Sequence, residues 1–133
     1  MTLVDTNILL DLLLNDPVWG EPSREAFVSR AALGPVQIVD AIFAETSVPF
    51  ASAMACERFL TALEIERRPM SSEALWRAGQ AFRQYRRRGG AKTNVLPDFF
   101  LGAEAECAQV PILTRDPRPY ATYFPEAKVF VVR

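Results

Sequence analysis

The sequence predicts a single α/β domain in which helices flank a parallel β-sheet. Short apolar segments typical of buried strands alternate along the chain with longer segments of helical character. This alternation is typical of parallel sheets, because their strands are joined by helical crossovers that cover both faces. The chain has 133 residues, of which 50% are hydrophobic, which suits one hydrophobic core. We therefore expect one domain over residues 1–133.

Five extended segments are expected, and the first begins almost at the first residue. Each is apolar or rich in β-branched residues, which is typical of buried strands. They are residues 2–5, 36–39, 64–69, 110–114 and 128–132.

Capping and breaking residues delimit the expected helices. Ser71 is a typical N-cap of the longest helix, and Gly89-Gly90 stops it. Pro49 interrupts the helix that contains Glu45, because it lacks the N–H that the Glu45 carbonyl would accept. The expected helices are residues 6–14, 22–33, 40–48, 52–63, 71–88 and 98–108, with a short helical turn from residue 116.

The composition excludes several kinds of chemistry. The chain has no histidine, which rules out a Ser-His-Asp or Cys-His system, His-ligated zinc and a His acid/base ribonuclease. The net charge is -1, so binding of a polyanion requires a local basic patch. Any catalysis therefore depends on carboxylates, together with a hard cation such as Mg²⁺ or Mn²⁺.

The two cysteines and the apolar segments predict a cytoplasmic protein without a membrane span. Cys56 and Cys107 lack CxxC spacing, and we interpret them as reduced packing residues. The N-terminal region has no basic leader, and Asp5 and Asp11 interrupt its apolar residues. No apolar segment approaches the roughly 18 residues of a membrane span.

Acidic residues follow or begin elements at one edge of the predicted sheet. Asp5 ends the first strand, Asp116 follows the strand that ends at Thr114, and Asp98 opens a helix. Glu45 lies one turn into the helix after the second strand. Ligands of open α/β sheets bind at the carboxyl ends of the strands. Four acids there would repel one another, and a divalent cation would relieve this repulsion.

Each acid also has a purely structural interpretation. Asp98 and Asp116 suit helix N-caps, the latter with Pro117 at the first helical position. Asp5 would stabilise the start of the helix that follows it, and Glu45, taken alone, would be a solvated residue of its helix. Only their joint placement favours a functional site.

Four segments resemble the PIN domain of VapC-type toxins, in matching order over nearly the whole chain. They are LVDTNILLDLL from residue 3, AETSV around Glu45, LPDFFLGAEA around Asp98 and ILTRDPRPYATYFP from residue 112. LVDTN alone is a weak signal, but its combination with the two later motifs is specific.

The resemblance implies a PIN-like three-layer fold with a five-stranded parallel sheet. It also implies an Mg²⁺- or Mn²⁺-dependent endoribonuclease, a homodimer and inhibition by a cognate VapB-type antitoxin. The family's acidic residues correspond to Asp5, Glu45, Asp98 and Asp116. Its neighbouring polar residues correspond to Thr6, Asn7 and Thr114, which are expected to bind substrate.

The expected reaction is hydrolysis of RNA by metal-activated water. Asp5 and Asp98 are the expected metal ligands. Glu45 and Asp116 would bind a second metal, hold metal-bound water or orient the attacking water, and the sequence does not choose among these roles. Because imidazole is absent, attack by the 2′-OH with histidine catalysis is excluded, and products with 5′-phosphate and 3′-hydroxyl ends are expected.

One position departs from the family pattern. Related sequences often read GAHA where this chain has Gly102-Ala103-Glu104-Ala105. Glu104 lies nearly two turns beyond Asp98, so we expect it to alter a surface contact and not to bind the metal.

Basic residues cluster at the end of the longest helix. Either they are solvated cations that complement the helix dipole, or they contact RNA phosphates or an antitoxin. Thr93 and Asn94 would lie between this cluster and the metal, and Trp76 is either an interface residue or partly packed. The cluster comprises Arg83, Arg86, Arg87, Arg88 and Lys92, of which Arg87 and Lys92, together with Arg115, are expected to bind substrate.

Two other functions compete with the ribonuclease. A haloacid-dehalogenase-like phosphatase would carry DxDx[TV] after its first strand, but Asn7 replaces the second acid here. A PIN fold retained only for binding or regulation would not require the full acidic set. Nucleotide-binding folds have no support, because neither GxGxxG nor a P-loop is present.

Overall fold

A computed structural model describes residues 1–92 and 95–133. The described chain contains a five-stranded, fully parallel sheet with strand order β3-β2-β1-β4-β5. The strands are β1 (Thr2–Val4), β2 (Val36–Ile38), β3 (Ile65–Arg67), β4 (Ile112–Thr114) and β5 (Val129–Val131). The α/β class, the parallel sheet and its five strands are confirmed.

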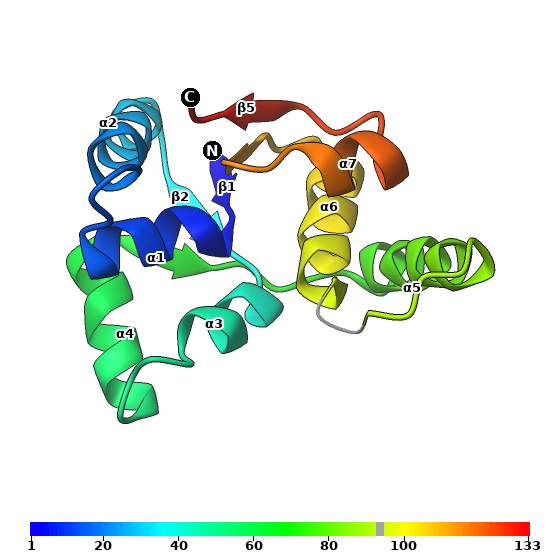
Figure 1. The fold of residues 1–133 in the computed structure, drawn as a ribbon, viewed down its shortest axis with the longest axis horizontal. Coiled ribbons are helices and arrows are strands. Elements are labelled where there is room, and N and C mark those ends of the chain that lie inside the picture. Colours follow the sequence, from blue (N-terminus) through cyan, green and yellow to red (C-terminus); the bar gives the residue numbers. More distant parts are fainter. Residues whose placement is uncertain (93–94) are drawn as a thin grey trace.

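Helices join the strands and cover the sheet. In Figure 1, α1 and α2 lie on one side of the strands, and α6 and α7 lie on the other side. The helices are α1 (Thr6–Leu14), α2 (Gly20–Ala31), α3 (Asp40–Thr46), α4 (Ala53–Ala62), α5 (Ser72–Arg87), α6 (Leu96–Ala108) and α7 (Arg118–Tyr123). No helix in the described ranges is long and apolar enough to cross a membrane.

The central strands are buried because they are apolar on both faces. Leu3, Val4, Ile38 and Ile112 are fully buried beneath the helices, as is typical of parallel strands. Thr2 of β1 pairs with Val36 of β2. The adjacent residue Leu3 pairs with Ile112 of β4, so the carboxyl ends of β2, β1 and β4 meet at one edge.

Several element boundaries differ from the prediction by a few residues. The helix expected to reach residue 48 ends at Thr46. Beyond this end, the N–H of Val48 donates a 3.5 Å hydrogen bond to the carbonyl of Glu45. Asp40 was expected to cap this helix, but it is the first helical residue and makes no capping bond. Helix α6 begins at Leu96, two residues before Asp98, because Pro97 suits its first turn.

Two of the quoted motifs meet in the core. The ring of Phe124, which belongs to the YFP segment after α7, packs against the backbone of Gly102 in α6. A side-chain carbon at Gly102 would overlap that ring. This packing fixes α7 against α6. It also brings Tyr120 of α7 close to the edge of the sheet where Asp5 follows β1.

Candidate active site

Asp5 is the centre of the acidic edge and is only 4% exposed. It follows β1 directly, and its Oδ1 accepts a 2.7 Å hydrogen bond from the N–H of Thr6 at the start of α1. Its Oδ2 accepts bonds from the hydroxyls of Thr114 at 2.8 Å and Tyr120 at 2.6 Å. Asp5 is therefore an N-cap, as one interpretation predicted, and also the junction of β1, β4 and α7. Burial raises the pKa of Asp5 even though these bonds lower it.

Thr6, Asn7 and Thr114 form a polar frame around Asp5. The amide of Asn7 donates to the Thr114 hydroxyl at 3.2 Å, and its carbonyl oxygen accepts from the N–H of Arg115 at 3.2 Å. The same Thr114 oxygen accepts from the N–H of Asp116 at 3.0 Å. Asn7 therefore bonds α1 to the end of β4 and does not lie free for substrate in this state.

Glu45 reaches the same edge from α3. Its Oε1 accepts a short hydrogen bond from the Thr6 hydroxyl. Burial raises the pKa of Glu45, and the neighbouring charge of Asp5 raises it further. Glu45 is therefore a partner of the site and not a solvated helix residue.

Asp98 enters the site from the first turn of α6. Burial, followed by repulsion from Asp5, Glu45 and Asp116, raises the pKa of Asp98 to about 7. It is the third residue of α6, and the backbone cap of that helix is Val95, without a side-chain capping bond. The capping interpretation of Asp98 is therefore wrong, and repulsion among the four acids is present, as their joint placement predicted.

Asp116 differs from the other three acids because it has a cationic partner. Its carboxylate accepts two hydrogen bonds from the Arg118 guanidinium, at 2.8 and 2.9 Å. It also accepts from the N–H of Arg118 at 3.1 Å. The N-cap of α7 is nevertheless Pro117 and not Asp116, so the predicted cap lies one residue later in the chain. The hydrogen bonds from Arg118 lower the pKa of Asp116.

The donor chemistry fits a hard divalent cation, although the acids do not yet form a closed ligand set. Oxygen ligands with raised pKa values are those that a cation would stabilise in their charged form. Asp5 Oδ1 accepts a single hydrogen bond among the described residues, which leaves a lone pair for a ligand. No group of three acidic side chains in residues 1–92 and 95–133 is close enough to enclose an ion. Binding would therefore require side-chain adjustment.

Tyr120 is the site residue that the sequence analysis did not single out. It is fully buried, yet its hydroxyl bonds to Asp5. Burial and the charges of Asp5, Asp98 and Glu45 raise the pKa of Tyr120 well above its ordinary value, so it remains a neutral donor. The signal was its place in the motif LTRD-x-x-x-Y, four residues after Asp116.

Asp11 also escaped the sequence analysis, and it engages Arg115. The Arg115 guanidinium donates two bonds to Asp11, at 2.7 and 2.9 Å, and lies 5.0 Å from the centre of the Trp19 ring. Ser23 donates a further bond to Asp11 at 2.6 Å. This network joins α1, α2 and the end of β4, so the structure gives Arg115 an internal partner in place of a free guanidinium.

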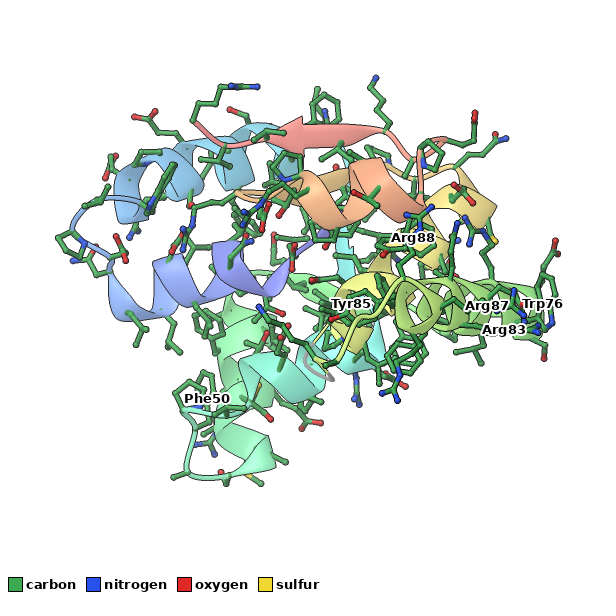
Figure 2. All side chains as sticks on the ribbon, turned by 45° about the vertical axis from the view of Figure 1, so that its right-hand side comes forward. Phe50, Trp76, Arg83, Tyr85, Arg87 and Arg88 are labelled. Atoms are coloured by element: carbon green, nitrogen blue, oxygen red, sulfur yellow. The ribbon has the colours of Figure 1, made fainter. Side chains whose placement is uncertain are left out.

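The basic cluster is divided between two surfaces. Arg83 and Arg87 project from the outer side of α5 near the exposed Trp76, away from Tyr85 and Arg88 (Figure 2). Arg88 lies 5.5 Å from the centre of the Tyr123 ring. Lys92 lines a cleft that also contains Asp98 and Asp116. Of the two residues predicted to bind substrate in this cluster, only Lys92 lies beside the acids. The predicted positions of Thr93 and Asn94 fall outside the described residues.

Glu104 is buried, which contradicts its expected role at the surface. It is 4% exposed and forms an ion pair with Arg68. Arg68 also donates to the Gln37 side chain at 3.2 Å. The prediction failed because residues 101–105 of α6 are all buried, so this part of the helix faces the protein and not solvent. Both cysteines are free thiols, as predicted. Cys56 packs in the core, but the prediction that Cys107 is a packing residue is wrong, because it is exposed.

Comparison with solved structures identifies the fold. The chain is similar to a chain of VapBC2 from Rickettsia felis bound to a promoter DNA fragment, with a TM-score of 0.73, 13% identity and coverage of 99% of this chain and 98% of that chain. A toxin–antitoxin complex from Klebsiella pneumoniae gives a TM-score of 0.71, 23% identity and coverage of 100% and 98%. DNA-bound VapBC from Salmonella typhimurium gives a TM-score of 0.70 and 19% identity, with coverage of 99% of this chain and 98% of that chain. No protein-family model and no curated protein matches the sequence. The PIN-like fold of VapC toxins, which the motifs predicted, is thus confirmed.

Proposed function

We propose that this protein is a VapC-type toxin that cuts RNA with Mg²⁺ or Mn²⁺ in the cytoplasm. The observation that carries the proposal is the mutual repulsion of three acids on separate elements, of which Asp5 is buried and Glu45 and Asp98 are half-buried. Asp5, Glu45 and Asp98 all have raised pKa values, for which burial is the leading cause and repulsion by a neighbouring carboxylate a further cause. A site that is unfavourable when empty is suited to a divalent cation.

In this proposal, Asp5 and Asp98 hold the cation. When bound, the cation would lower the pKa of a water molecule and neutralise charge on the phosphate. Thr114 and Tyr120 orient Asp5 through their hydroxyls. Glu45 is held by Thr6, and with Asp116 it either binds a second cation or orients the attacking water. Asp116 stays ionised to low pH because Arg118 lowers its pKa.

A second candidate is a PIN fold retained only for binding or regulation. It is favoured by the lack of any closed three-acid group in the described ranges, and by the pairing of Asp116 with Arg118. A phosphatase is not favoured, because Asn7 occupies the position of its second acid and is bonded to Thr114.

The test is incubation of the purified protein with a mixed RNA pool, with Mn²⁺ or with EDTA, followed by mapping of the product ends. We expect Mn²⁺-dependent cuts with 5′-phosphate and 3′-hydroxyl ends, and their loss in Asp98→Asn. Asp40→Asn is the matched control, because Asp40 is an exposed acid in the first turn of a helix. Undiminished cleavage in EDTA would contradict the mechanism, and no cleavage under any condition would favour the binding module.

The proposed partners are a VapB-type antitoxin and a second copy of the chain. Their support is the fold shared with chains of VapBC complexes and the exposed Trp76, which is 64% accessible. Co-purification with the product of the neighbouring gene tests the antitoxin. Light scattering at micromolar concentration tests the homodimer, and a monomeric mass would contradict it.

A further inference from the structure

A cleft beside the acids has an aromatic wall that the cleavage chemistry does not require. It lies between the end of α5, the start of α6 and α7, with a volume of about 480 Å³. Asp98 and Asp116 line one part of it, and Lys92 and Arg118 contribute cations. Tyr85, Phe99 and Tyr123 form the aromatic wall, which is called here the tyrosine wall.

The tyrosine wall is built in advance and not assembled by a ligand. Tyr123 packs edge-on against Phe99, with ring centres 5.0 Å apart, and Tyr85 lies 5.7 Å from Phe99 in a similar arrangement. The Tyr85 hydroxyl accepts a 3.1 Å hydrogen bond from the N–H of Lys92. Gly90 passes so close to the Tyr85 ring that a side-chain carbon there would overlap it. Tyr85 and Tyr123 nevertheless remain partly exposed.

We propose that this cleft is a subsite for one unpaired nucleotide of the RNA, whose base packs against the tyrosine wall. The inference rests on the proposed function and specifies its substrate as unpaired RNA. Aromatic side chains stack on the faces of splayed bases, which paired bases do not offer. The volume falls within the roughly 300–1,000 Å³ of small-ligand sites and is far too small for a duplex.

The charges in the cleft favour RNA over a peptide. An acidic peptide would face Asp98 and Asp116, and a basic peptide would face Lys92 and Arg118. An RNA strand suits the cleft with or without a cation. One phosphate would meet Lys92 in either state, and another would meet the cation when the acids hold it. The strand would thereby place a phosphate next to Asp98 while the adjoining base occupies the tyrosine wall.

The first test measures binding without cleavage, using fluorescent oligouridylate and an RNA duplex of equal length in EDTA. We expect the unpaired strand to bind more tightly, and Tyr123→Leu to weaken it by about tenfold. Tyr123→Phe keeps an aromatic ring and should bind normally. Trp76→Leu is the control for loss of an exposed aromatic outside the cleft. Equal binding of strand and duplex, or no effect of Tyr123→Leu in a folded protein, would overturn the inference.

A second test uses the unmodified protein, so it does not depend on the folding of a variant. Oligonucleotides containing 5-iodouridine are photocrosslinked to the wild-type chain, and the attachment sites are mapped by mass spectrometry. We expect crosslinks at Tyr85 or Tyr123. Crosslinks confined to Trp76 would overturn the subsite. A protein partner that protects the cleft, when RNA does not protect it, would overturn it as well. Both tests measure RNA binding in EDTA and do not depend on cleavage. An RNA that binds in this cleft but is never cut would therefore contradict only the proposed nuclease activity.

The role of Lys92 is tested through the salt dependence of oligouridylate binding. Lys92→Ala should reduce the slope of log affinity against log salt by about 1, because one phosphate contact is lost. Lys128→Ala is the matched control, because Lys128 is exposed just before β5, at the opposite edge of the sheet. An unchanged slope in Lys92→Ala would remove Lys92 from the subsite.

Discussion

The hydroxyl of Tyr120 lies 2.6 Å from Oδ2 of Asp5 and donates a hydrogen bond to it within the core. Helix α7 thereby supports the carboxylate at the end of β1, although 115 positions separate the two residues in sequence. Tyr120 is fully buried, and in the proposed mechanism its role is to position Asp5.

Tyr120→Phe tests this positioning role. The substitution keeps the ring and removes one of three hydrogen bonds to Asp5, so we expect the free energy of unfolding to fall by about 2 kcal/mol in EDTA. The affinity for Mn²⁺ should also fall, because Asp5 loses its orientation. Denaturant melts and Mn²⁺ calorimetry measure the two effects. Tyr123→Phe is the control, since its hydroxyl makes no hydrogen bond among the described residues; equal losses in both variants would contradict the role.

The pKa of Asp98 predicts a pH-dependent penalty in the metal-free protein. The folded-state pKa of about 7 exceeds the ordinary 3.8, so the folded protein binds the proton more tightly than the unfolded chain. Stability is therefore lost as pH rises from about 4 to about 7 and levels off above that range. Asp98→Asn removes the charge, so in EDTA it should be more stable than wild type at pH 8 and lose most of this advantage near pH 4. Thermal melts across this range measure the difference, and a constant difference would refute the repulsion.

The buried pair of Glu104 and Arg68 predicts a coupled effect on stability. Glu104→Gln should cost about 2–3 kcal/mol, because it leaves the Arg68 charge without its partner in a mostly buried position. Arg68→Met combined with Glu104→Gln should recover part of that loss, since the unpaired charge is then absent. Urea melts of both singles and the double variant give the coupling energy. Additive losses would show that the ion pair contributes nothing specific.

Arg115 provides a contrast with Lys92. Because Asp11 is buried and receives both bonds from Arg115, Arg115→Ala should lower the free energy of unfolding by about 3 kcal/mol. Lys92→Ala should change stability by less than about 0.5 kcal/mol, as is usual for an exposed side chain. In EDTA, Lys92→Ala should weaken RNA binding more than Arg115→Ala does, provided that both variants are folded. A stable Arg115→Ala that fails to bind RNA would restore the predicted substrate contact.

The fold was predictable because its signals are local and periodic. Caps such as Ser71, which accepts from the N–H of Ala74 at 3.1 Å, and the alternation of strands with helices need no tertiary information. Boundaries were less predictable: Asp98 was expected to begin its helix, but Pro97 permits the helix to start earlier. Glu104 was misplaced because a charge was assumed to face solvent, whereas Arg68 compensates it inside the protein.

The place of three acids was predictable from the strands that precede them, but their partners were not. Asp5, Glu45 and Asp116 follow β1, β2 and β4, whose carboxyl ends meet at one edge. Asp98 reaches the same edge from α6, which follows the helix α5 and not a strand. The bonds of Tyr120 to Asp5 and of Arg115 to Asp11 span more than 100 positions. They depend on packing such as that of Phe124 against Gly102, which no local pattern encodes.

The most direct test of the central claim is calorimetric titration of Mn²⁺ into the metal-free protein at pH 8. The account predicts that wild type binds Mn²⁺ and that Asp98→Asn, although folded and more stable, binds it at least tenfold more weakly. Asp40→Asn should bind like wild type, because Asp40 is exposed and outside the acidic site. Equal Mn²⁺ binding by wild type and Asp98→Asn, or no binding by either, would contradict the metal site.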